Sequence, residues 1–225
     1  MSVKPDRSTQ TAHLAWDERW RSEAGRGAWL TPAPEVVEIL PTLRQRGARR
    51  VLDLGCGVGR HVLLFARAGF EVFGLDASEG GIRHTREAAV EAGVDVDLRV
   101  GMMTDLPYAD GSFDYVLAFN VIYHGHPGVV QRTTDEIHRV LRRGGPYQGT
   151  MLSKRNTHYG TGDEVARDTF VKGAGDKAHP HFYCNAWELV ALFHGFELLS
   201  LTDRPQEEPG SWHWYVIAEK AALRS

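Results

Sequence analysis

Apolar residues along the 225-residue chain alternate between short continuous runs and stretches with helical spacing. Short apolar runs bounded by glycine or charged residues are typical of buried strands, and they cover residues 50–55, 71–76, 96–101, 112–120 and 147–153. Helical spacing falls between these runs, over residues 59–69, 81–93 and 129–145. Strands that alternate with helices predict a parallel sheet with helices on both faces.

The C-terminal part of the chain predicts a different strand pair. Apolar stretches at 196–203 and 211–220 follow one more helical segment and are joined by a Pro- and Glu-rich loop. We expect them to form an antiparallel hairpin at one edge of the sheet. A chain of 225 residues suits one α/β domain. Residues 1–225 are therefore predicted to form one Rossmann-like, doubly wound domain with a seven-stranded, mostly parallel sheet.

Two segments stand outside the alternation. Residues 1–45 begin with a polar stretch, continue into the tryptophan-rich "AWDERW", and end in a helical pattern that Pro41 can interrupt. Residues 154–183 are polar, rich in glycine, and longer than most connections between elements. We expect the first segment to be an N-terminal lid or helical segment and the second to be an insertion near a ligand pocket.

Composition and charge narrow the class of protein. Apolar residues make up 42% and charged residues 24%, as in ordinary globular proteins. The net charge of −3 provides no positive field for nucleic acid, and no apolar stretch approaches the roughly 18 residues of a membrane span. The two cysteines, Cys56 and Cys184, cannot support a disulfide framework. A cytoplasmic protein without nucleic-acid or membrane partners is expected, and its oligomeric state is left open.

The sequence "VLDLGCGVGRH" joins a buried strand directly to a helix. Gly55, Gly57 and Gly59 permit positive φ and let a ligand approach bare backbone. A dinucleotide fingerprint would need glycine or alanine where this chain has Arg60. Asp76 ends the next strand, where a carboxylate suits hydrogen bonds from two ribose hydroxyls. The two features together predict a nucleoside-binding site.

Four motifs in this order and spacing resemble the class I S-adenosylmethionine-dependent methyltransferases, in particular small-molecule enzymes of the methyltransferase type 11 kind. The motifs are "VLDLGCGVGR", "EVFGLDAS", "DLPYADGSFDYVLAFNVIYH" and "EIHRVLRRGG". The resemblance runs from about Trp16 to the C-terminus and is strongest over residues 51–145. It implies S-adenosyl-L-methionine as cofactor and methyl transfer to a small-molecule acceptor as activity.

The resemblance also implies which residues contact the cofactor. Its methionine part would meet Asp53, Gly55, Cys56, Gly57 and Gly59, its ribose Asp76, its adenine Ala77, Met103 and Thr104, and its sulfonium end Asn120 and Val121. In "WDERW", Arg19 would pair with the cofactor carboxylate and Trp20 would shield the sulfonium, since an indole face attracts a cation.

Two positions depart from the family pattern. Met102 stands where many relatives have an acid that reads the adenine amino group, so this contact falls to Asp105 or to backbone. The run Arg143-Gly144-Gly145-Pro146 replaces the Arg-Pro-Gly-Gly common in relatives, which alters a turn and not the chemistry.

The acceptor side is predicted from histidines near strand ends. Methyl transfer needs alignment and exclusion of water, and acceptors of high pKa usually need a general base as well. Ligands bind at the carboxyl ends of strands in doubly wound sheets. The sequence "NVIYHGH" follows the fourth strand. We expect Tyr123 and His124 to be catalytic and His126 to contact the acceptor.

The stretch "KAHPHFYC" has two interpretations. His179, His181 and Cys184 resemble metal ligands if the insertion brings His124, His126 or His158 to them. Pro180 and Asn185 instead indicate an extended approach to a helix that Asn185 caps. We expect His179 and His181 to contact the acceptor, and no metal ion.

Two other classes of function stay open at this point. One is a non-catalytic S-adenosylmethionine-binding protein, and the other, less favoured, is an NAD-dependent oxidoreductase. Within methyltransferases, "GCGVGRHVLLFARAGFEVFGLD" also resembles the tellurite-resistance and thiopurine branch, which methylates soft atoms. The identity of the acceptor atom does not follow from the sequence.

Overall fold

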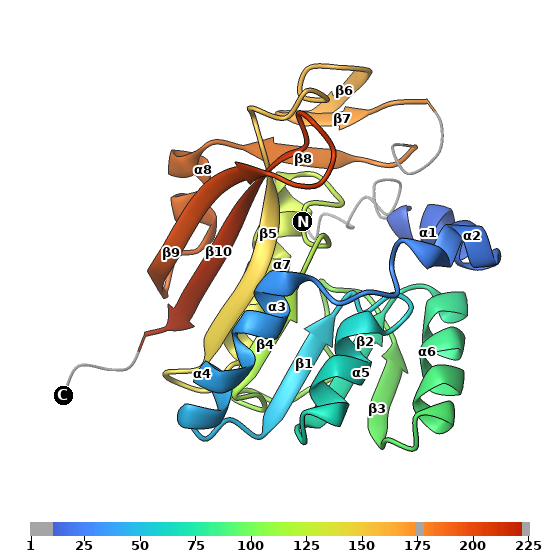
Figure 1. Cartoon of the computed structure of the whole chain (residues 1–225). Coiled ribbons are helices and arrows are strands. Elements are labelled where there is room, and N and C mark those ends of the chain that lie inside the picture. The colour runs from blue at the N-terminus through green and yellow to red at the C-terminus, as the bar shows by residue number, and fades with distance from the viewer. Residues whose placement is uncertain (1–10, 174–177, 222–225) are drawn as a thin grey trace, which may run out of the picture.

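The computed structural model describes residues 11–173 and 178–221 (Figure 1). The first half of the described chain contains α1 (Ala12–Trp20), α2 (Glu23–Gly27), α3 (Pro34–Glu38), α4 (Leu40–Gln45), β1 (Arg50–Leu54), α5 (Arg60–Arg67), β2 (Glu71–Asp76), α6 (Glu79–Glu91) and β3 (Val96–Val100). The second half contains β4 (Tyr115–Ala118), α7 (Pro127–Val140), β5 (Pro146–Ser153), β6 (Asp163–Ala166), β7 (Thr169–Val171), β8 (His181–Cys184), α8 (Ala186–Leu192), β9 (Phe196–Pro205) and β10 (Trp212–Lys220).

The predicted doubly wound sheet is confirmed. Five parallel strands lie in the order β3-β2-β1-β4-β5, and β10 and β9 continue the sheet as an antiparallel hairpin. One apolar cluster includes Val62 of α5 and Leu43 of α4, and a second includes Ile137 of α7 and Leu189 of α8. The helices therefore bury apolar side chains on both faces of the sheet (Figure 1).

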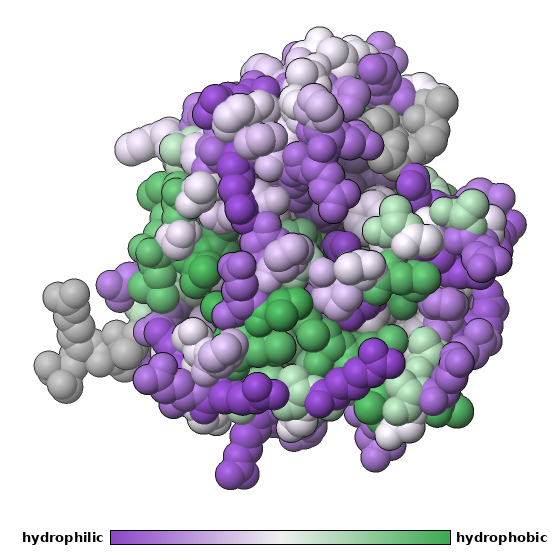
Figure 2. Space-filling model, in the orientation of Figure 1, coloured by the Kyte–Doolittle hydropathy of each residue, from purple (hydrophilic) through white to green (hydrophobic). Residues whose placement is uncertain are grey.

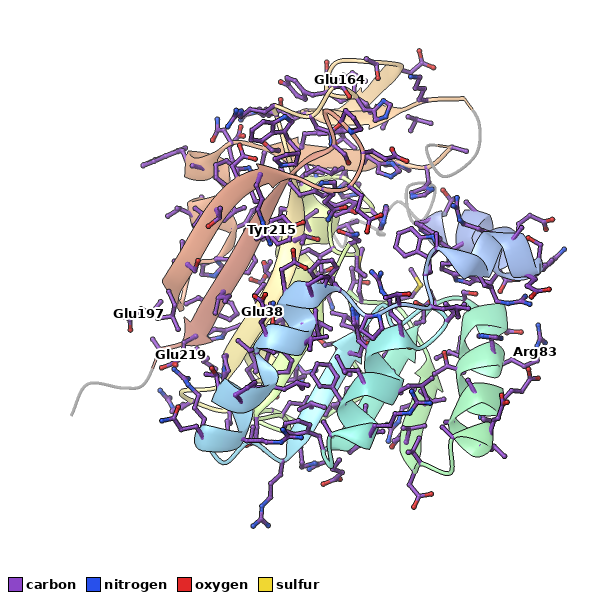
Figure 3. The ribbon with its side chains drawn as sticks, in the orientation of Figure 1. Glu38, Arg83, Glu164, Glu197, Tyr215 and Glu219 are labelled. Carbon is purple, nitrogen blue, oxygen red and sulfur yellow. The ribbon has the colours of Figure 1, made fainter. Side chains whose placement is uncertain are left out.

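Among the described residues the sheet contains ten strands and not the predicted seven. The three additional strands are β6, β7 and β8, which lie between residues 163 and 184 in and at the end of the predicted insertion, where too few residues are apolar for strands to be recognised from the sequence. β6 and β7 form a hairpin whose turn includes Asp168 at φ 55° and is fastened by the hydrogen bond from the Asp168 amide to Glu164 Oε1. Glu164 is labelled in Figure 3. Side-chain hydrogen bonds thus supply the local order that apolar periodicity does not.

The strand β8 occupies a place that β4 leaves vacant. β4 ends at Ala118, opposite Gly149 in the middle of β5, whereas β10 pairs with β5 as far as Leu152. β8 pairs in parallel with Leu152 and Ser153. Because β10 already fills one edge there, β8 lies on the edge that β4 left. The insertion is therefore brought directly above the carboxyl end of β4.

In Figure 1, α1 and α2 lie beyond the carboxyl ends of β2 and β3, whereas α3 and α4 lie beside the sheet. Pro41 interrupts the predicted helix, because the chain forms two short helices and proline stands in the first turn of α4. Parts of the predicted lid and insertion, residues 1–10 and 174–177, lie outside the described residues, and Lys177 of "KAHPHFYC" is among them.

The surface over the hairpin β6–β7 is mostly hydrophilic to neutral, whereas hydrophobic side chains gather over β9 and β10 (Figure 2). Tyr215 of β10 lies on this side, with the Arg204 guanidinium 3.9 Å from its ring centre (Figure 3). Across residues 11–173 and 178–221, no helix is long and apolar enough to cross a membrane.

Candidate active site

A cleft lies at the carboxyl ends of β1, β2 and β4 and is covered by α1. It encloses about 950 Å³, part of which is open to solvent. Its walls include many of the residues that the sequence singled out, namely Trp20, Gly55, Cys56, Gly57, Asp76, Ala77, Met103, Thr104, Asn120, Val121 and His124. The position agrees with the rule that ligands bind outside the carboxyl ends of the strands in doubly wound sheets.

The glycine loop forms one wall of the cleft, and its glycines are required by the backbone. Gly55, Gly57 and Gly59 have φ values of 69°, 53° and 86°. A Cβ atom on Gly55 would lie 2.4 Å from Val121, and one on Gly59 would lie 2.5 Å from Thr85. Side chains are therefore excluded both by φ and by the close approach of neighbouring elements. This wall presents backbone to a ligand.

Asp76 is fixed at the end of β2 by two backbone amides. Its Oδ2 accepts a hydrogen bond from Gly57 N, and its Oδ1 accepts one from Ser78 N, both at 2.8 Å. Burial raises the pKa of Asp76, and these two hydrogen bonds oppose the rise. The carboxylate joins the glycine loop to the N-terminus of α6, where the N-cap Ser78 accepts from Gly81 N.

Asp53 lies at the end of β1 and is only 2% exposed. Burial raises its pKa to about 8, although the charge of Arg60 favours ionisation. Its Oδ2 is buried and has no hydrogen-bond partner among the described residues. A buried carboxylate oxygen without a donor is costly. This oxygen therefore fits a cationic or hydrogen-bonding group that the chain itself does not supply.

The lid contains three tryptophans in mutual contact. The rings of Trp16 and Trp20 stack with centroids 5.0 Å apart, and Trp29 meets Trp16 edge-on at 5.1 Å. A Cβ atom on Gly57 would lie 3.4 Å from Trp20, so the lid rests on the glycine loop. The indole nitrogen of Trp20 is buried and has no hydrogen-bond partner in the described part of the chain.

Asp17, which the sequence analysis did not single out, fastens α1 to the start of α6. Asp17 Oδ1 accepts hydrogen bonds from the Ser78 hydroxyl and from Gly80 N, both at 2.8 Å. The backbone amide of Gly80, and then the Ser78 hydroxyl, lower the pKa of Asp17. Arg19 is exposed, lies 5.7 Å from the Trp16 ring centre, and does not line the cleft.

Asn120 adopts a left-handed conformation, with φ 62°, directly after β4. Its amide donates to Thr150 Oγ1, and its Oδ1 accepts from the Thr150 hydroxyl and from Gln206 Nε2. The backbone carbonyl of Asn120 is paired with His124 Nε2 at 3.2 Å. The constrained turn thus sets the orientation of the His124 ring at the edge of the cleft.

Three histidines come together behind this edge. His179 Nε2 lies 2.9 Å from His124 Nδ1, and the ring centres of His179 and His181 are 4.4 Å apart. All three side chains are buried. Cys184 lies apart from them and directs its thiol to the carbonyl of Leu152. The predicted cap Asn185 forms a capping box with Glu188 at the start of α8.

The insertion that carries two of these histidines is fastened by a buried acid. Asp168 accepts hydrogen bonds from the Tyr159 hydroxyl at 2.8 Å and from Lys154 Nζ at 2.9 Å. Burial alone would raise the pKa of Asp168, but Lys154 and Tyr159 bring it below its usual range. The carbonyl of Asp168 also accepts from Tyr183 N in β8. The position of the histidine pair is therefore fixed through the hairpin.

Several predicted site residues lie outside the cleft wall, namely Arg19, Asp53, Gly59, Tyr123, His126, His179 and His181. Tyr123 is buried beside His124, with ring centres 4.5 Å apart. His126 is the N-cap of α7, and its Nδ1 accepts from Gly128 N and Val129 N. Asp105, the predicted alternative adenine contact, is exposed and does not line the cleft.

Other wall residues were not assigned by the sequence. Arg60 lines the cleft, with its guanidinium 5.1 Å from the Trp29 ring centre, and burial lowers its pKa. His13, Trp16 and Trp29 line the cleft as well. A single charged residue directly after the glycine loop, in an otherwise apolar turn, is the signal that marks Arg60 in the sequence.

The match to a known family covers the part of the chain that contains the glycine loop, Asp76 and His124. Residues 51–145 match a family model described as a methyltransferase domain. A ubiquinone biosynthesis O-methyltransferase of Ruegeria pomeroyi is 33% identical over 148 residues, which cover 64% of this chain and 58% of that protein. A probable S-adenosylmethionine-dependent methyltransferase of Mycolicibacterium smegmatis is 37% identical over 175 residues, which cover 76% of this chain and 58% of that protein. The chain thus spans less than two thirds of the length of either relative.

The fold is similar to the crystal structure of the 1,6-didemethyltoxoflavin-N1-methyltransferase of Burkholderia thailandensis, with bound 1,6-didemethyltoxoflavin and S-adenosylhomocysteine. The TM-score is 0.72 at 20% identity, over 99% of this chain and 93% of that one. The sheet order and the cleft define a Rossmann-like cofactor-binding protein. Residues 51–145 thus match a methyltransferase domain, and the chain is similar in sequence to S-adenosylmethionine-dependent methyltransferases over part of their length.

Proposed function

We propose that the protein transfers a methyl group from S-adenosylmethionine to a small-molecule acceptor. The observation that carries this proposal is the position of Asp76, which two amides hold beside a loop of glycines and under the tryptophan lid. A carboxylate at this point of the sheet can accept hydrogen bonds from both ribose hydroxyls. A bare loop leaves room for the rest of the cofactor.

The remaining residues of the wall fit the other parts of this cofactor. We assign the adenine to Ala77, Met103 and Thr104, and the amino-acid end to the glycine loop, with the unpartnered oxygen of Asp53 as acceptor for the ammonium. Trp20 would face the sulfonium, which an indole stabilises as it does other cations. S-adenosylmethionine supplies an electrophilic methyl group on that sulfonium. The protein's contribution is to align the acceptor and exclude water.

The acceptor is assigned to the end of the cleft near Asn120, Val121 and His124. The tryptophan lid and the insertion border this end, and a small molecule is the class of acceptor that such a covered cleft admits. Similarity to a ubiquinone biosynthesis O-methyltransferase and to a methyltransferase structure with bound 1,6-didemethyltoxoflavin supports this class. Contacts of Tyr123, His126, His179 and His181 with the acceptor stay predictions.

Two broader expectations belong to the same proposal. The net charge of −3 favours a protein without nucleic-acid partners. Cys56 and Cys184 are both buried free thiols, and burial raises the pKa of each, which suits a cytoplasmic protein.

Two measurements test the proposal. Titration calorimetry should show binding of S-adenosylmethionine and S-adenosylhomocysteine, and no binding of NAD. A screen of phenols, amines, thiols and metalloid oxyanions, followed by formation of S-adenosylhomocysteine, should then identify an acceptor. Binding of NAD, or of none of the three, would contradict the proposal. Cofactor binding without turnover on any acceptor would instead favour a non-catalytic S-adenosylmethionine-binding protein.

A further inference from the structure

The three histidines behind the cleft form a compact group of ring nitrogens. One nitrogen from each of His124, His179 and His181 lies within 4.8 Å of the other two. The side chains are 7%, 1% and 2% exposed. Three imidazoles buried in mutual contact are an arrangement that packing alone does not favour, because each ring has polar nitrogens that must be satisfied.

Backbone carbonyls determine which nitrogens of two rings can bind a cation. A carbonyl oxygen accepts, so His124 Nε2 donates to Asn120 O at 3.2 Å, and His181 Nδ1 donates to His179 O at 2.8 Å. In neutral imidazoles this leaves lone pairs on His124 Nδ1 and His181 Nε2. Metal-binding histidines typically have this arrangement, in which the second nitrogen donates to a backbone carbonyl or carboxylate and fixes the ring.

The sequence explains why these two positions of the insertion, and not the cysteine, are brought together. His179 lies at a bend just before β8 and His181 is the first residue of that strand, and their ring centres are 4.4 Å apart, so the two side chains lie on the same side of the chain. Cys184 is three residues beyond His181 in the same strand and therefore lies on the opposite face, where its thiol meets Leu152 O. β8 occupies the edge that β4 leaves, which places the His-x-His pair above His124.

We propose that His124, His179 and His181 bind one divalent transition-metal ion, with Zn²⁺ as the best fit. Imidazole ligands suit zinc and its neighbours and do not suit magnesium or calcium, which prefer oxygen. Zinc–nitrogen bonds of about 2.0–2.1 Å in a tetrahedral site put ligand nitrogens about 3.4 Å apart. His124 Nδ1 and His179 Nε2 lie 2.9 Å apart. Ring rotations that move the ligand nitrogens by about 1 Å bring them to the spacing of a tetrahedral zinc site.

The place of the fourth ligand follows from the cleft. Three protein ligands with one open position are typical of catalytic and not structural zinc. His124 is the member of the group that lines the cleft, and its ring lies 5.9 Å from Trp16 of the lid. The next step rests on the proposed function: the open coordination position of the metal ion belongs to the methyl acceptor. The substrate class is then a small molecule whose hydroxyl or amine can bind a metal ion.

The test uses the full chain, free of any affinity tag and treated with chelator. Zn²⁺ is titrated by calorimetry, and Co²⁺ is added separately to record the visible absorption of a four-coordinate ion. One equivalent of Zn²⁺ should bind. His179→Ala and His181→Ala should weaken binding at least about tenfold. His213→Ala is the matched control, because His213 is also buried and its ring lies 5.9 Å from Tyr123, but it is not part of the group.

S-adenosylhomocysteine binding, measured on each variant, shows whether the cofactor side is still folded. If His179→Ala does not fold, His181→Gln replaces it. The proposal is overturned if the wild-type chain binds no stoichiometric Zn²⁺, or if both histidine variants bind it as tightly as the wild type. If the wild-type chain does not bind S-adenosylhomocysteine, the proposed function alone is refuted, since Zn²⁺ binding is measured without cofactor.

Discussion

The two walls of the cleft are built in opposite ways. The glycine wall comes from consecutive residues between β1 and α5, presents backbone, and is held by hydrogen bonds of Asp76 to Gly57 and Ser78. The histidine wall is His124, which lines the cleft, backed by His179 and His181, which lie behind it and 55 and 57 residues further along the chain; it presents a side chain. The first wall has a shape that almost no substitution can vary, whereas the second can change its chemistry by exchanging side chains on an inserted strand.

This difference assigns separate tasks to the two walls. A backbone wall recognises a ligand that does not change, such as a cofactor. A wall of side chains on an insertion can be adapted to a particular acceptor without disturbing the sheet. Variants in the two walls are therefore expected to have separable effects, and the following experiments either separate them or show that they are coupled.

The largest effect is expected from Asp76→Ala, which should weaken S-adenosylhomocysteine binding by about 100-fold or more. The variant removes the two proposed hydrogen bonds from the ribose hydroxyls to the Asp76 carboxylate, and each is worth about 1.5–3 kcal/mol. Calorimetry provides the measurement. Asp105→Ala, in an exposed residue outside the cleft, and His181→Ala, in the other wall, should both stay within about twofold of the wild type. A large loss in His181→Ala would mean that the walls are coupled.

Gly55→Ala should destabilise the fold by about 2 kcal/mol more than Gly47→Ala. Both residues have φ near 70°, but a Cβ atom on Gly55 would collide with Val121, whereas one on Gly47 meets nothing within 4 Å. The pair therefore separates the cost of crowding the wall from the cost of positive φ. Chemical denaturation measures both free energies of unfolding. Equal losses would show that the glycine wall can yield.

Cofactor binding should depend on pH through Asp53. Its carboxyl holds a proton below pH 8, because burial raises its pKa to about 8. Pairing with the cofactor ammonium favours the ionised form, so binding expels the proton and weakens as the pH falls. The association constant of the cofactor should increase by up to about tenfold between pH 6 and pH 7 and level off above pH 8. Calorimetry in buffers of different ionisation enthalpy should detect proton release, and Asp53→Asn should abolish it.

Asp17→Ala should have the smallest effect, a loss of about 1 kcal/mol in stability. The hydrogen bonds from Gly80 and Ser78 lower the pKa of Asp17 in the folded state. Its stabilisation is therefore fully present above the unfolded pKa of about 3.9 and is lost as the pH falls through the lower folded value. Thermal unfolding at neutral and acidic pH measures the difference. Glu18→Ala, which removes an exposed ion pair with Arg21, is the control.

The sequence predicted the glycine wall well and the histidine wall poorly, for one physical reason. Strand, glycine turn, helix and Asp76 follow each other locally, and the periodicity of short segments determines them. The meeting of His124 with His179 and His181 depends on where β8 pairs, and β8 pairs with β5 through only two residues. No short-range pattern encodes that choice of edge. The sequence therefore identified the histidines as candidates without indicating which residues they contact.

The N-terminal lid gives a second example. The tryptophans of "WDERW" signalled a cover, and Trp20 does line the cleft. Arg19 was expected to turn inward, but the helix α1 presents Asp17 to the N-terminus of α6 and leaves Arg19 exposed. The rotation of a short helix about its axis depends on its partner, since "AWDERW" has no strong apolar stripe of its own.

Ser78 contacts both the helix α1 and Asp76, the acid that we propose binds the ribose: its hydroxyl donates to Asp17 and its amide donates to Asp76. The docking of α1 over the cleft and the binding of a ligand in the cleft therefore both involve Ser78. Thermodynamic reciprocity then applies: if a bound ligand tightens the docking of α1 by some factor, docking of α1 must tighten the ligand by the same factor. A change at Ser78 would alter both equilibria together, and neither could be adjusted alone.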